Sequence, residues 1–517
     1  MTPYPVSAPG GTVRDWLDEH AGTVPDKVSH VFPGHGSMTW FELRDTADDI
    51  ARRLTGLGIR RGESVAVMIP NGRAGVALLF GVLYGGFRLT MINIAAGPAA
   101  VAHALDHSGA RFVFLDHGRF DLLDAARTSV ALDVTAVPVD NGTDHSWSER
   151  ASKLHDVAAG DDALLMYTSG TTGRPKGVLH THSSLLAGGW TTAQAHELTP
   201  EDRAYCVLPI YHINGLCVTI LGPLVSGGSV TVCERFSAGR FWQQCGEFEV
   251  TWFSAVPTII SYLVHGETEP DSMVRQRIRF GRSASSALSP DVQRSFESRF
   301  GIPVIETMGL TEAAAQILSN PLPPGRRKLG SPGIAYGNSI AILSPEFVPL
   351  PPGQEGEIAV RGPNVMRGYF RDPVASAESR TEDGWLRTGD LGTLDDDGYV
   401  FVTGRLKELI IKGGENIAPR EIDETLYAHP DVVEAAAFPR TCERYGERVE
   451  AAVKLRSGTS VSAGQLMDMC RERLGEFKSP DRIFLLDELP KGPSGKIQRL
   501  KLASLTGEDR SGKTRSA

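Results

Sequence analysis

Short apolar runs rich in β-branched residues recur along the chain, and longer segments with apolar residues at helical spacing separate them. The short runs include residues 64–69, 111–115, 229–232 and 340–343, and the longer segments include residues 41–56 and 291–300. A short apolar run is typical of a buried strand, whereas apolar residues three and four positions apart are typical of a helix. The alternation therefore predicts an α/β fold with largely parallel sheets, because helices join parallel strands.

The chain has 517 residues, more than one hydrophobic core usually serves. The residue pattern changes past residue 390. There an Asp-Asp-Asp-Gly turn at 395–398 precedes an apolar strand at 399–403 and a charged segment at 404–408. We predict a large N-terminal domain of several subdomains over residues 1–403. A small α+β C-terminal domain then covers residues 408–517, and the two meet at residues 404–407.

The overall charge argues against nucleic acid and anionic membranes as partners. The formal net charge is −9 and no long basic run occurs, so nothing attracts a polyanionic surface. The composition, 41% hydrophobic and 22% charged, is that of a globular protein. We expect small-molecule partners, and the sequence does not indicate an oligomeric state.

The cysteine pattern and the N-terminus favour a cytoplasmic protein. Six widely spaced cysteines form no CxxC pair, which predicts reduced thiols rather than a disulfide framework or a zinc site. Residues 1–11 have neither the charged region nor the apolar region of a secretory signal. The most apolar stretch, residues 74–87, is too short for a membrane span and predicts a buried helix.

A loop dense in hydroxyl groups and glycines, YTSGTTGRPKG at residues 167–177, follows an apolar strand at 163–166. Glycines let backbone N–H groups approach a polyphosphate, hydroxyls add donors, and a lysine adds a mobile positive charge. The loop's candidate ligand-binding residues are Thr168, Ser169, Gly170, Thr171, Thr172, Gly173 and Lys176. A Ser/Thr/Gly-rich surface turn is the alternative, and the length of this eleven-residue segment, with a lysine near its end, disfavours it.

The segment GEDRSGKT at residues 507–514 matches the Walker P-loop spacing. A P-loop needs a preceding strand and a following helix whose N-terminus faces the phosphates. No apolar strand leads into this segment, and only three residues follow it. We therefore reject it as a nucleotide site.

The loop at 167–177 resembles the signature of the adenylate-forming (AMP-binding) superfamily, which includes acyl-CoA synthetases, peptide-synthetase adenylation domains and firefly luciferase. Further segments agree with that family in order and spacing: LPIYHING at 208–215, ETMGLTEA at 306–313, GWLRTGDL at 384–391, GRLKELIIKGGENIAPREID at 404–423 and LPKGPSGKIQR at 489–499. The resemblance covers nearly the whole chain, and parts are most similar to oxalyl-CoA synthetases and 4-coumarate–CoA ligase-like enzymes.

The resemblance implies an ATP-dependent acid–CoA ligase that uses ATP, Mg²⁺ and coenzyme A. Such an enzyme forms an acyl-adenylate from ATP and an organic acid, then a CoA thioester with release of AMP. The resemblance also implies that residues 1–403 form an adenylation domain, that residues 404–407 form a hinge, and that the C-terminal domain is mobile.

For the nucleotide, the family pattern assigns the ribose to Asp390, which follows glycine in what reads as a turn, and a second ribose or phosphate contact to Arg405. An Asx turn and a surface ion pair are the respective alternatives. Met308 occupies a position that is often an adenine-stacking aromatic in relatives, so packing there would rely on a thioether. Ser285 and Ser286 stand where many relatives have alanines beside the adenine.

For the chemistry, the resemblance assigns magnesium to Glu312 and includes Thr311 and Lys176 among the catalytic residues. Lys496, in a Ser-Gly-Lys turn, is our main catalytic candidate, because the attack of a carboxylate on the α-phosphate joins two anions and needs a positive charge. An isolated glutamate or lysine would otherwise be a solvated side chain, so these roles depend on the motifs.

Three further roles come from the resemblance. His212 would gate the acyl pocket and coenzyme tunnel, although a lone histidine near a strand end is more often a structural donor. Gly414, within residues 413–416, would line the tunnel for the pantetheine arm, since small residues let a narrow thiol arm pass. Lys407 occupies the family's hinge position.

The acid pocket would contain His212, Asn214, Trp252, Ser254, Ser283 and Ala315. No carboxylate follows the gate, which disfavours an α-amino acid as substrate, and the other residues indicate a compact, partly polar pocket. Residues 280–300 and 311–323 resemble oxalyl-CoA synthetases. However, Ala315 stands where those enzymes have a histidine that we associate with oxalate, which argues against oxalate itself.

Two alternatives stay open. One is an adenylating enzyme that transfers the activated acid to a carrier protein or an amine, or that activates a non-carboxylic acid such as nitrite. The other is a non-catalytic protein that keeps the fold. The presence of Lys176, Glu312, Asp390 and Lys496 disfavours the second.

Overall fold

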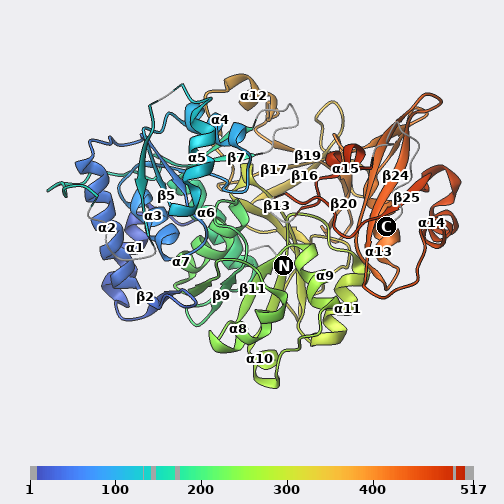
Figure 1. The fold of residues 1–517 in the computed structure, drawn as a ribbon, viewed down its shortest axis with the longest axis horizontal. Coiled ribbons are helices and arrows are strands. Elements are labelled where there is room, and N and C mark those ends of the chain that lie inside the picture. Colours follow the sequence, from blue (N-terminus) through green and yellow to red (C-terminus); the bar gives the residue numbers. More distant parts are fainter. Residues whose placement is uncertain (1–7, 132, 141–146, 169–174, 493–495, 507–517) are drawn as a thin grey trace.

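The computed structural model describes residues 8–131, 133–140, 147–168, 175–492 and 496–506 (Figure 1). The strands and helices predicted from the alternating pattern form as expected. The four short runs become β3, β5, β10 and β16, and the two longer segments become α2 and α11. Within the described residues, no helix combines the length and the apolarity needed to cross a bilayer.

The first large sheet has nine strands in the order β15–β14–β13–β12–β11–β9–β10–β1–β2. Its inner strands, from β13 to β1, pair in parallel, and β2, β14 and β15 add antiparallel edges. The strands are β1 (Val28–Val31), β2 (Ser37–Thr39), β9 (Arg203–Cys206), β10 (Ser229–Val232), β11 (Trp252–Ala255), β12 (Phe280–Ser283), β13 (Val304–Leu310), β14 (Ala315–Ser319) and β15 (Ile334–Ala335).

The second large sheet has seven strands in the order β18–β8–β7–β4–β3–β5–β6. Strands β7, β4, β3, β5 and β6 pair in parallel, whereas β8 and β18 are antiparallel. The strands are β3 (Ser64–Met68), β4 (Arg88–Met91), β5 (Phe112–Leu115), β6 (Thr135–Pro138), β7 (Asp162–Thr168), β8 (Lys176–Thr181) and β18 (Gly368–Tyr369). The prediction of parallel-rich sheets is confirmed.

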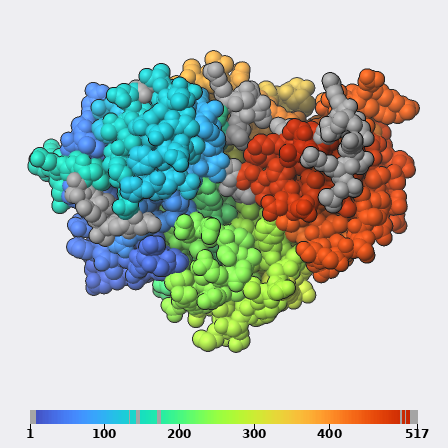
Figure 2. All heavy atoms as spheres, in the orientation of Figure 1, coloured from blue at the N-terminus to red at the C-terminus, as the bar shows by residue number. Residues whose placement is uncertain are grey.

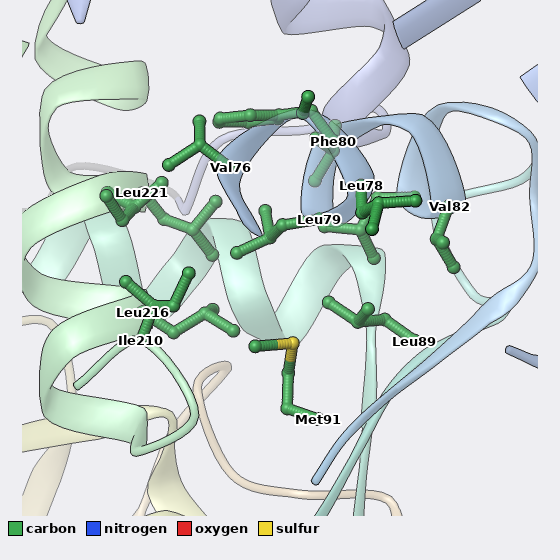
Figure 3. Packing of buried hydrophobic residues seen from close by; sticks show 14 of the residues in the cluster. Val76, Leu78, Leu79, Phe80, Val82, Leu89, Met91, Ile210, Leu216 and Leu221 are labelled. Atoms are coloured by element: carbon green, nitrogen blue, oxygen red, sulfur yellow. The ribbon is translucent and has the colours of Figure 1, made fainter. Parts of the chain in front are cut away.

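Buried helices lie between the two sheets: α3 (Arg73–Tyr84), α6 (His182–Ala195), the π-helix η2 (Asn214–Leu221) and α7 (Gly222–Ser226). Helix α3 is apolar on all sides, as expected of a helix covered on every face, and from Ala74 onward its residues are all buried. Figure 3 shows side chains of α3, β4 and η2 packed together in this layer. The predicted buried helix is confirmed for residues 74–84, and the last three residues of the predicted range form a turn before β4.

Other helices cover the outer faces and edges. Helices α4 (Pro98–Ser108) and α5 (Phe120–Arg127) pack on the seven-stranded sheet. Helices α8 (Phe241–Glu247), α9 (Pro257–His265), α10 (Ser272–Arg277) and α11 (Pro290–Phe300) pack on the nine-stranded sheet. Helices α1 (Val13–Thr23) and α2 (Trp40–Gly56) join the central core, α12 (Pro373–Glu378) follows β18, and η1 (His117–Arg119), η3 (Ala238–Arg240) and η4 (Thr311–Ala313) are short 3₁₀ turns.

A smaller antiparallel sheet completes the N-terminal domain, with the strand order β16–β17–β19–β20. Its strands are β16 (Ser339–Leu343), β17 (Gly356–Arg361), β19 (Leu386–Leu394) and β20 (Val400–Arg405). The Asp-Asp-Asp-Gly segment forms the turn between β19 and β20, as predicted.

The C-terminal domain has its own mixed sheet and its own apolar core, which confirms the predicted smaller α+β domain. The strands are β21 (Ile410–Lys412), β22 (Glu415–Ile417), β23 (Val432–Cys442), β24 (Gly446–Leu455) and β25 (Arg482–Leu485), and the helices are α13 (Pro419–Tyr427), α14 (Ala463–Lys478) and α15 (Arg499–Leu505). Figure 1 shows this domain at the opposite end of the molecule from α1 and α2.

The two domains meet through helix α9 and strand β23, and Figure 2 shows the C-terminal domain packed against the N-terminal one. The Tyr262 hydroxyl donates to Oε1 of the fully buried Glu434 at 2.6 Å, and Lys491 Nζ lies 2.7 Å from the same oxygen. Ser261 Oγ adds a hydrogen bond to the Val433 carbonyl at 2.7 Å. This group of contacts, which we call the α9–β23 latch, holds the C-terminal domain in the observed orientation.

Candidate active site

Asp390 and Arg405 face each other on adjacent strands of the small antiparallel sheet. They are paired in register, and Arg405 Nε lies 3.1 Å from Asp390 Oδ1. Burial raises the pKa of Asp390, whereas Arg405 and Lys496 lower it. The expectation of a Gly-Asp turn at 390 is wrong: β19 continues through Asp390 because its pairing with β20 extends to Arg405.

Lys496 of the C-terminal domain interacts electrostatically with both members of this ion pair. Lys496 is exposed by surface area, yet the protein atoms around its ammonium group and the Arg405 guanidinium lower the pKa of Lys496. The carboxylates of Asp390, Glu408 and Glu312 act in the opposite sense and raise it. Lys496 therefore lies within electrostatic reach of residues that three separate sequence motifs provide.

A second group of residues lies around Tyr369 on β18. The Tyr369 hydroxyl donates to Glu312 Oε1 at 2.9 Å, and Lys176 Nζ lies 4.7 Å from the centroid of the tyrosine ring. Burial and the adjacent Glu312 carboxylate raise the pKa of Tyr369. Tyr369 thus connects the predicted phosphate lysine with the predicted magnesium ligand, and the sequence analysis did not identify it.

A single carboxylate at Glu312 suits magnesium, which takes few protein carboxylates and completes its shell with phosphate oxygens and water. Across the described residues, no group of three or more His, Cys, Asp or Glu side chains forms an all-protein metal site. The residues present therefore fit a magnesium ion that is shared with the phosphates of ATP.

Only the two ends of the predicted phosphate loop are described. Thr168 ends β7 and pairs with Lys176 at the start of β8. The His103 ring contacts the Pro175 carbonyl through Nε2 at 2.9 Å and so supports the chain where it enters β8. A strand leads into the loop as predicted, while Ser169, Gly170, Thr171, Thr172 and Gly173 lie outside the described residues.

His212 precedes the π-helix η2, and Asn214 begins it. Burial and Lys496 lower the pKa of His212 to about 4, and its buried Nε2 has no hydrogen-bond partner among the described residues. Asn214 Nδ2 donates to Ser285 Oγ at 3.3 Å. Ser285 has a φ of +76°, a backbone strain of the kind that gathers at functional sites. These three residues connect the surroundings of Lys496 with the interior of the nine-stranded sheet.

Behind Asn214 lies Arg282, which the sequence analysis did not identify either. Arg282 Nη1 donates to Asn214 Oδ1 at 2.9 Å and to Ser254 Oγ at 3.0 Å, and its Nε donates to Gln316 Oε1 at 3.2 Å. The side chain is 1% exposed, and burial lowers the pKa of Arg282 to about 9. No carboxylate of the described residues lies within ion-pair distance of it.

Not all predicted pocket residues join this group. Trp252 is fully buried and stacks on Phe280, so it belongs to the apolar core. Ser283 follows Arg282 on β12, and because side chains alternate along a strand it faces the other side of the sheet. Its buried hydroxyl has no hydrogen-bond partner among the described residues.

The remaining predicted residues lie nearby on loops and strand ends. Thr311 and Glu312 form the 3₁₀ turn η4, and the Thr311 carbonyl contacts the buried His180 ring at 2.7 Å. Ala315 begins β14 with a φ of +80° and is 4% exposed, directly before Gln316. Met308 on β13 is half-buried, and Ser286 is exposed in the loop after β12.

Gly414 and Lys407 lie in two turns at the start of the C-terminal domain. Gly414 is in the exposed turn between β21 and β22, where it has a φ of +89°. The neighbouring Gly413 N–H donates to Tyr445 within the C-terminal domain. Lys407 lies in the turn that connects β20 with β21, which is the connection between the two domains.

Comparison with known proteins agrees with this arrangement. The family model of the AMP-binding enzyme matches residues 17–370, and that of the AMP-binding enzyme C-terminal domain matches residues 421–496. The sulfoacetate–CoA ligase of Cupriavidus necator is 45% identical over 95% of this chain and 97% of its own length. The oxalate–CoA ligase of Arabidopsis thaliana is 36% identical over 94% of this chain and 97% of its own.

Solved structures agree as well. The o-succinylbenzoate CoA synthetase (MenE) of Bacillus subtilis, in complex with its acyl-adenylate intermediate, has a TM-score of 0.82 and 30% identity over 94% of this chain and 97% of its own. ATP-bound MatB from Rhodopseudomonas palustris has a TM-score of 0.85 and 28% identity over 96% of this chain and 99% of its own.

The chain belongs to the AMP-binding enzyme family. It is an ATP-dependent, AMP-forming acid–CoA ligase that uses ATP, Mg²⁺ and coenzyme A. Because its relatives are named CoA ligases, transfer to a carrier protein or an amine and activation of nitrite are not favoured.

Proposed function

We propose that the residues gathered around Lys496 carry out adenylation. The observation that carries this proposal is that Lys496 of the C-terminal domain lies within electrostatic reach of Asp390, Arg405 and Glu312 of the N-terminal domain. Asp390 accepts the ribose hydroxyls, Arg405 adds a ribose or phosphate contact, and Glu312 holds the magnesium ion beside the phosphates. Lys176 and the loop before it bind the phosphates, and Thr311 lines the same site.

In the first half-reaction a carboxylate oxygen of the acid forms a bond to the α-phosphorus as the bond to pyrophosphate breaks. Lys496 supplies positive charge between the two anions, where it is needed most in the transition state. Magnesium, when bound, neutralises phosphate charge. In the second half-reaction the thiol sulfur of coenzyme A bonds to the acyl carbon, AMP leaves, and the thiol proton goes to solvent.

The acid is proposed to be small and polar. Asn214, Ser285 and the unpartnered His212 Nε2 provide hydrogen-bonding groups beside Lys496. Relatives named for sulfoacetate and oxalate support such a substrate. Because Ala315 replaces the histidine that we associate with oxalate, we place other short polar acids ahead of oxalate.

The second half-reaction is proposed to use a different orientation of the C-terminal domain. The Gly414 turn would line the coenzyme tunnel, whereas in the orientation seen here it is Lys496 that interacts with Asp390, Arg405 and Glu312. We propose a hinge at residues 404–407, with Lys407 as the hinge residue, and the turn between β20 and β21 at residues 406–408 supports it. Residues 1–403 and 408–517 would then be the two rigid parts.

We propose a cytoplasmic location because the cysteines are not paired in disulfides. All six cysteines are free and five are buried, as expected in a reducing compartment.

The test is a pyrophosphate-release screen with purified enzyme, ATP and Mg²⁺ against short polar, dicarboxylic, hydroxy, aromatic and fatty acids, with and without coenzyme A. We expect sustained turnover with a small polar acid only when coenzyme A is present, together with equal amounts of AMP and thioester. Turnover that is independent of coenzyme A, or pyrophosphate release with none of these acids, would contradict the proposal.

A further inference from the structure

Arg282 is an unusual side chain because it is a buried cation whose described partners are all neutral. Its guanidinium donates to Asn214, Ser254 and Gln316, and no described carboxylate lies within ion-pair distance. Burial of a charge without a counter-ion is costly, and buried charges are therefore normally paired. A buried arginine that lacks an anion inside the protein can obtain one from a ligand.

The bonds around Arg282 also fix the orientation of Asn214. The Asn214 Oδ1 atom accepts from both Arg282 Nη1 and Ser254 Oγ, so the amide oxygen faces the interior. Its Nδ2 group consequently points the other way, toward Ser285 Oγ. Arg282 therefore holds Asn214 as a hydrogen-bond donor toward the acid pocket.

These residues define a direction through the pocket. Burial and Lys496, where we propose that the reacting carboxylate meets the α-phosphate, lower the pKa of His212. His212 is two residues before Asn214. Asn214 in turn contacts Arg282 directly at 2.9 Å. A short acid that extends from Lys496 past His212 would thus place its far end against the Asn214 amide, with the Arg282 charge behind it.

We propose that Arg282, acting through Asn214, selects acids that carry a second anionic group, a carboxylate or a sulfonate, at the end remote from the reacting carboxylate. Arg282 is a positioning residue: it orients the Asn214 donor and supplies positive potential at the end of the proposed acid site that is remote from Lys496. Unit charges about 6 Å apart in a partly buried site change binding on the order of 100-fold. This inference rests on the proposed acid-activating site and names its substrate class.

The test compares acids of similar length within each enzyme variant. Malonate and sulfoacetate carry a second anionic group, one a carboxylate and the other a sulfonate, whereas propionate carries none. For the unaltered enzyme we expect kcat/KM in pyrophosphate release to favour at least one dianion over propionate by on the order of 100-fold, mainly through KM. The two dianions distinguish carboxylate from sulfonate as the preferred group.

Arg282→Met should remove this preference, Arg282→Lys should retain part of it, and KM for ATP should change little. The preference ratio does not depend on the fraction of folded enzyme, so a purely structural role of Arg282 would leave it unaltered. Arg279→Met is the matched control, because Arg279 directly precedes β12 and pairs with Asp202 at 2.5 Å, outside the pocket group. We expect its ratio to equal that of the unaltered enzyme.

If Arg282→Met does not fold, Asn214→Asp decides the question. It places a carboxylate against Arg282, satisfies the buried charge internally, and should abolish the dianion preference in a stable protein. An unchanged ratio in Asn214→Asp or Arg282→Met overturns the inference, as does equal use of propionate by the unaltered enzyme. These results leave the acid–CoA ligase function intact. A failure to release pyrophosphate with any of the acids tested would refute that function instead.

Discussion

At the scale of single residues, Tyr369 is the contact whose removal is easiest to interpret. Tyr369→Phe keeps the ring beneath Lys176 but removes the hydrogen bond to Glu312. Hydrogen bonds to charged groups contribute about 1.5–3 kcal/mol, so we expect adenylation to slow by about tenfold or more, with a higher magnesium requirement. Pyrophosphate release measured across a magnesium titration checks this.

Tyr399→Phe is the matched control, because the Tyr399 hydroxyl donates to the Arg326 carbonyl and contacts none of the proposed catalytic residues. A rate for Tyr369→Phe equal to that of the control at every magnesium concentration would exclude Tyr369 from the site.

The difference between predicted and missed residues has a physical cause. Lys176, Glu312, Asp390 and Lys496 lie within continuous motifs whose residue types match their proposed chemistry, so the sequence alone was enough to propose roles for them. Tyr369 lies on a two-residue strand, and Arg282 lies in the middle of a buried one. Their importance depends on contacts with residues 57 and 68 positions away, which no local pattern contains.

At the scale of elements, the α9–β23 latch should favour the orientation of the C-terminal domain seen here. Tyr262→Phe removes two hydrogen bonds between the domains, the one that the hydroxyl donates to Glu434 and the one that it accepts from Lys491 Nζ, but leaves the Glu434–Lys491 pair inside the C-terminal domain. We expect adenylation to fall by about tenfold or more, because both lost hydrogen bonds involve a charged group. Thioester formation from a supplied acyl-adenylate should be unchanged or faster.

Separate assays of the two half-reactions check this prediction. An equal loss in both would mean that the latch supports general stability rather than one orientation of the domain. Elements such as β10 and α11 were predictable from apolar periodicity. The latch was not, because Tyr262 and Glu434 read as ordinary polar residues until the fold brings them together.

At the scale of the whole molecule, buried histidines should set the response to acid. Burial lowers the pKa of His30 to about 3 and those of His180 and His182 to about 4. The unfolded chain binds these protons near pH 6.5, so the neutral histidines stabilise the fold above that pH and lose this contribution as the pH falls. At pH 5 each of these histidines lowers the free energy of unfolding by about 2 kcal/mol relative to neutral pH. Burial raises the pKa of Glu306 to about 6, and this carboxyl offsets only about 1 kcal/mol of that loss.

Thermal unfolding at pH 7.5 and pH 5.0 tests this account. We expect a clearly lower unfolding midpoint at pH 5.0. The difference between the two midpoints should be smaller for His30→Met, which removes a buried ring whose Nε2 has no hydrogen-bond partner among the described residues. Equal midpoints at the two pH values would show that these histidines become protonated without unfolding the protein.

The central claim is that Lys496, brought in by the C-terminal domain, completes the site for the first half-reaction only. The direct measurement is pyrophosphate exchange by Lys496→Ala, set beside thioester formation by the same variant from a supplied acyl-adenylate and coenzyme A. Lys501→Ala, an exposed lysine on α15, is the control for both assays. We predict an exchange rate lower by at least about 100-fold with unchanged thioester formation. Exchange at the control rate, or an equal loss in both half-reactions, would contradict the account.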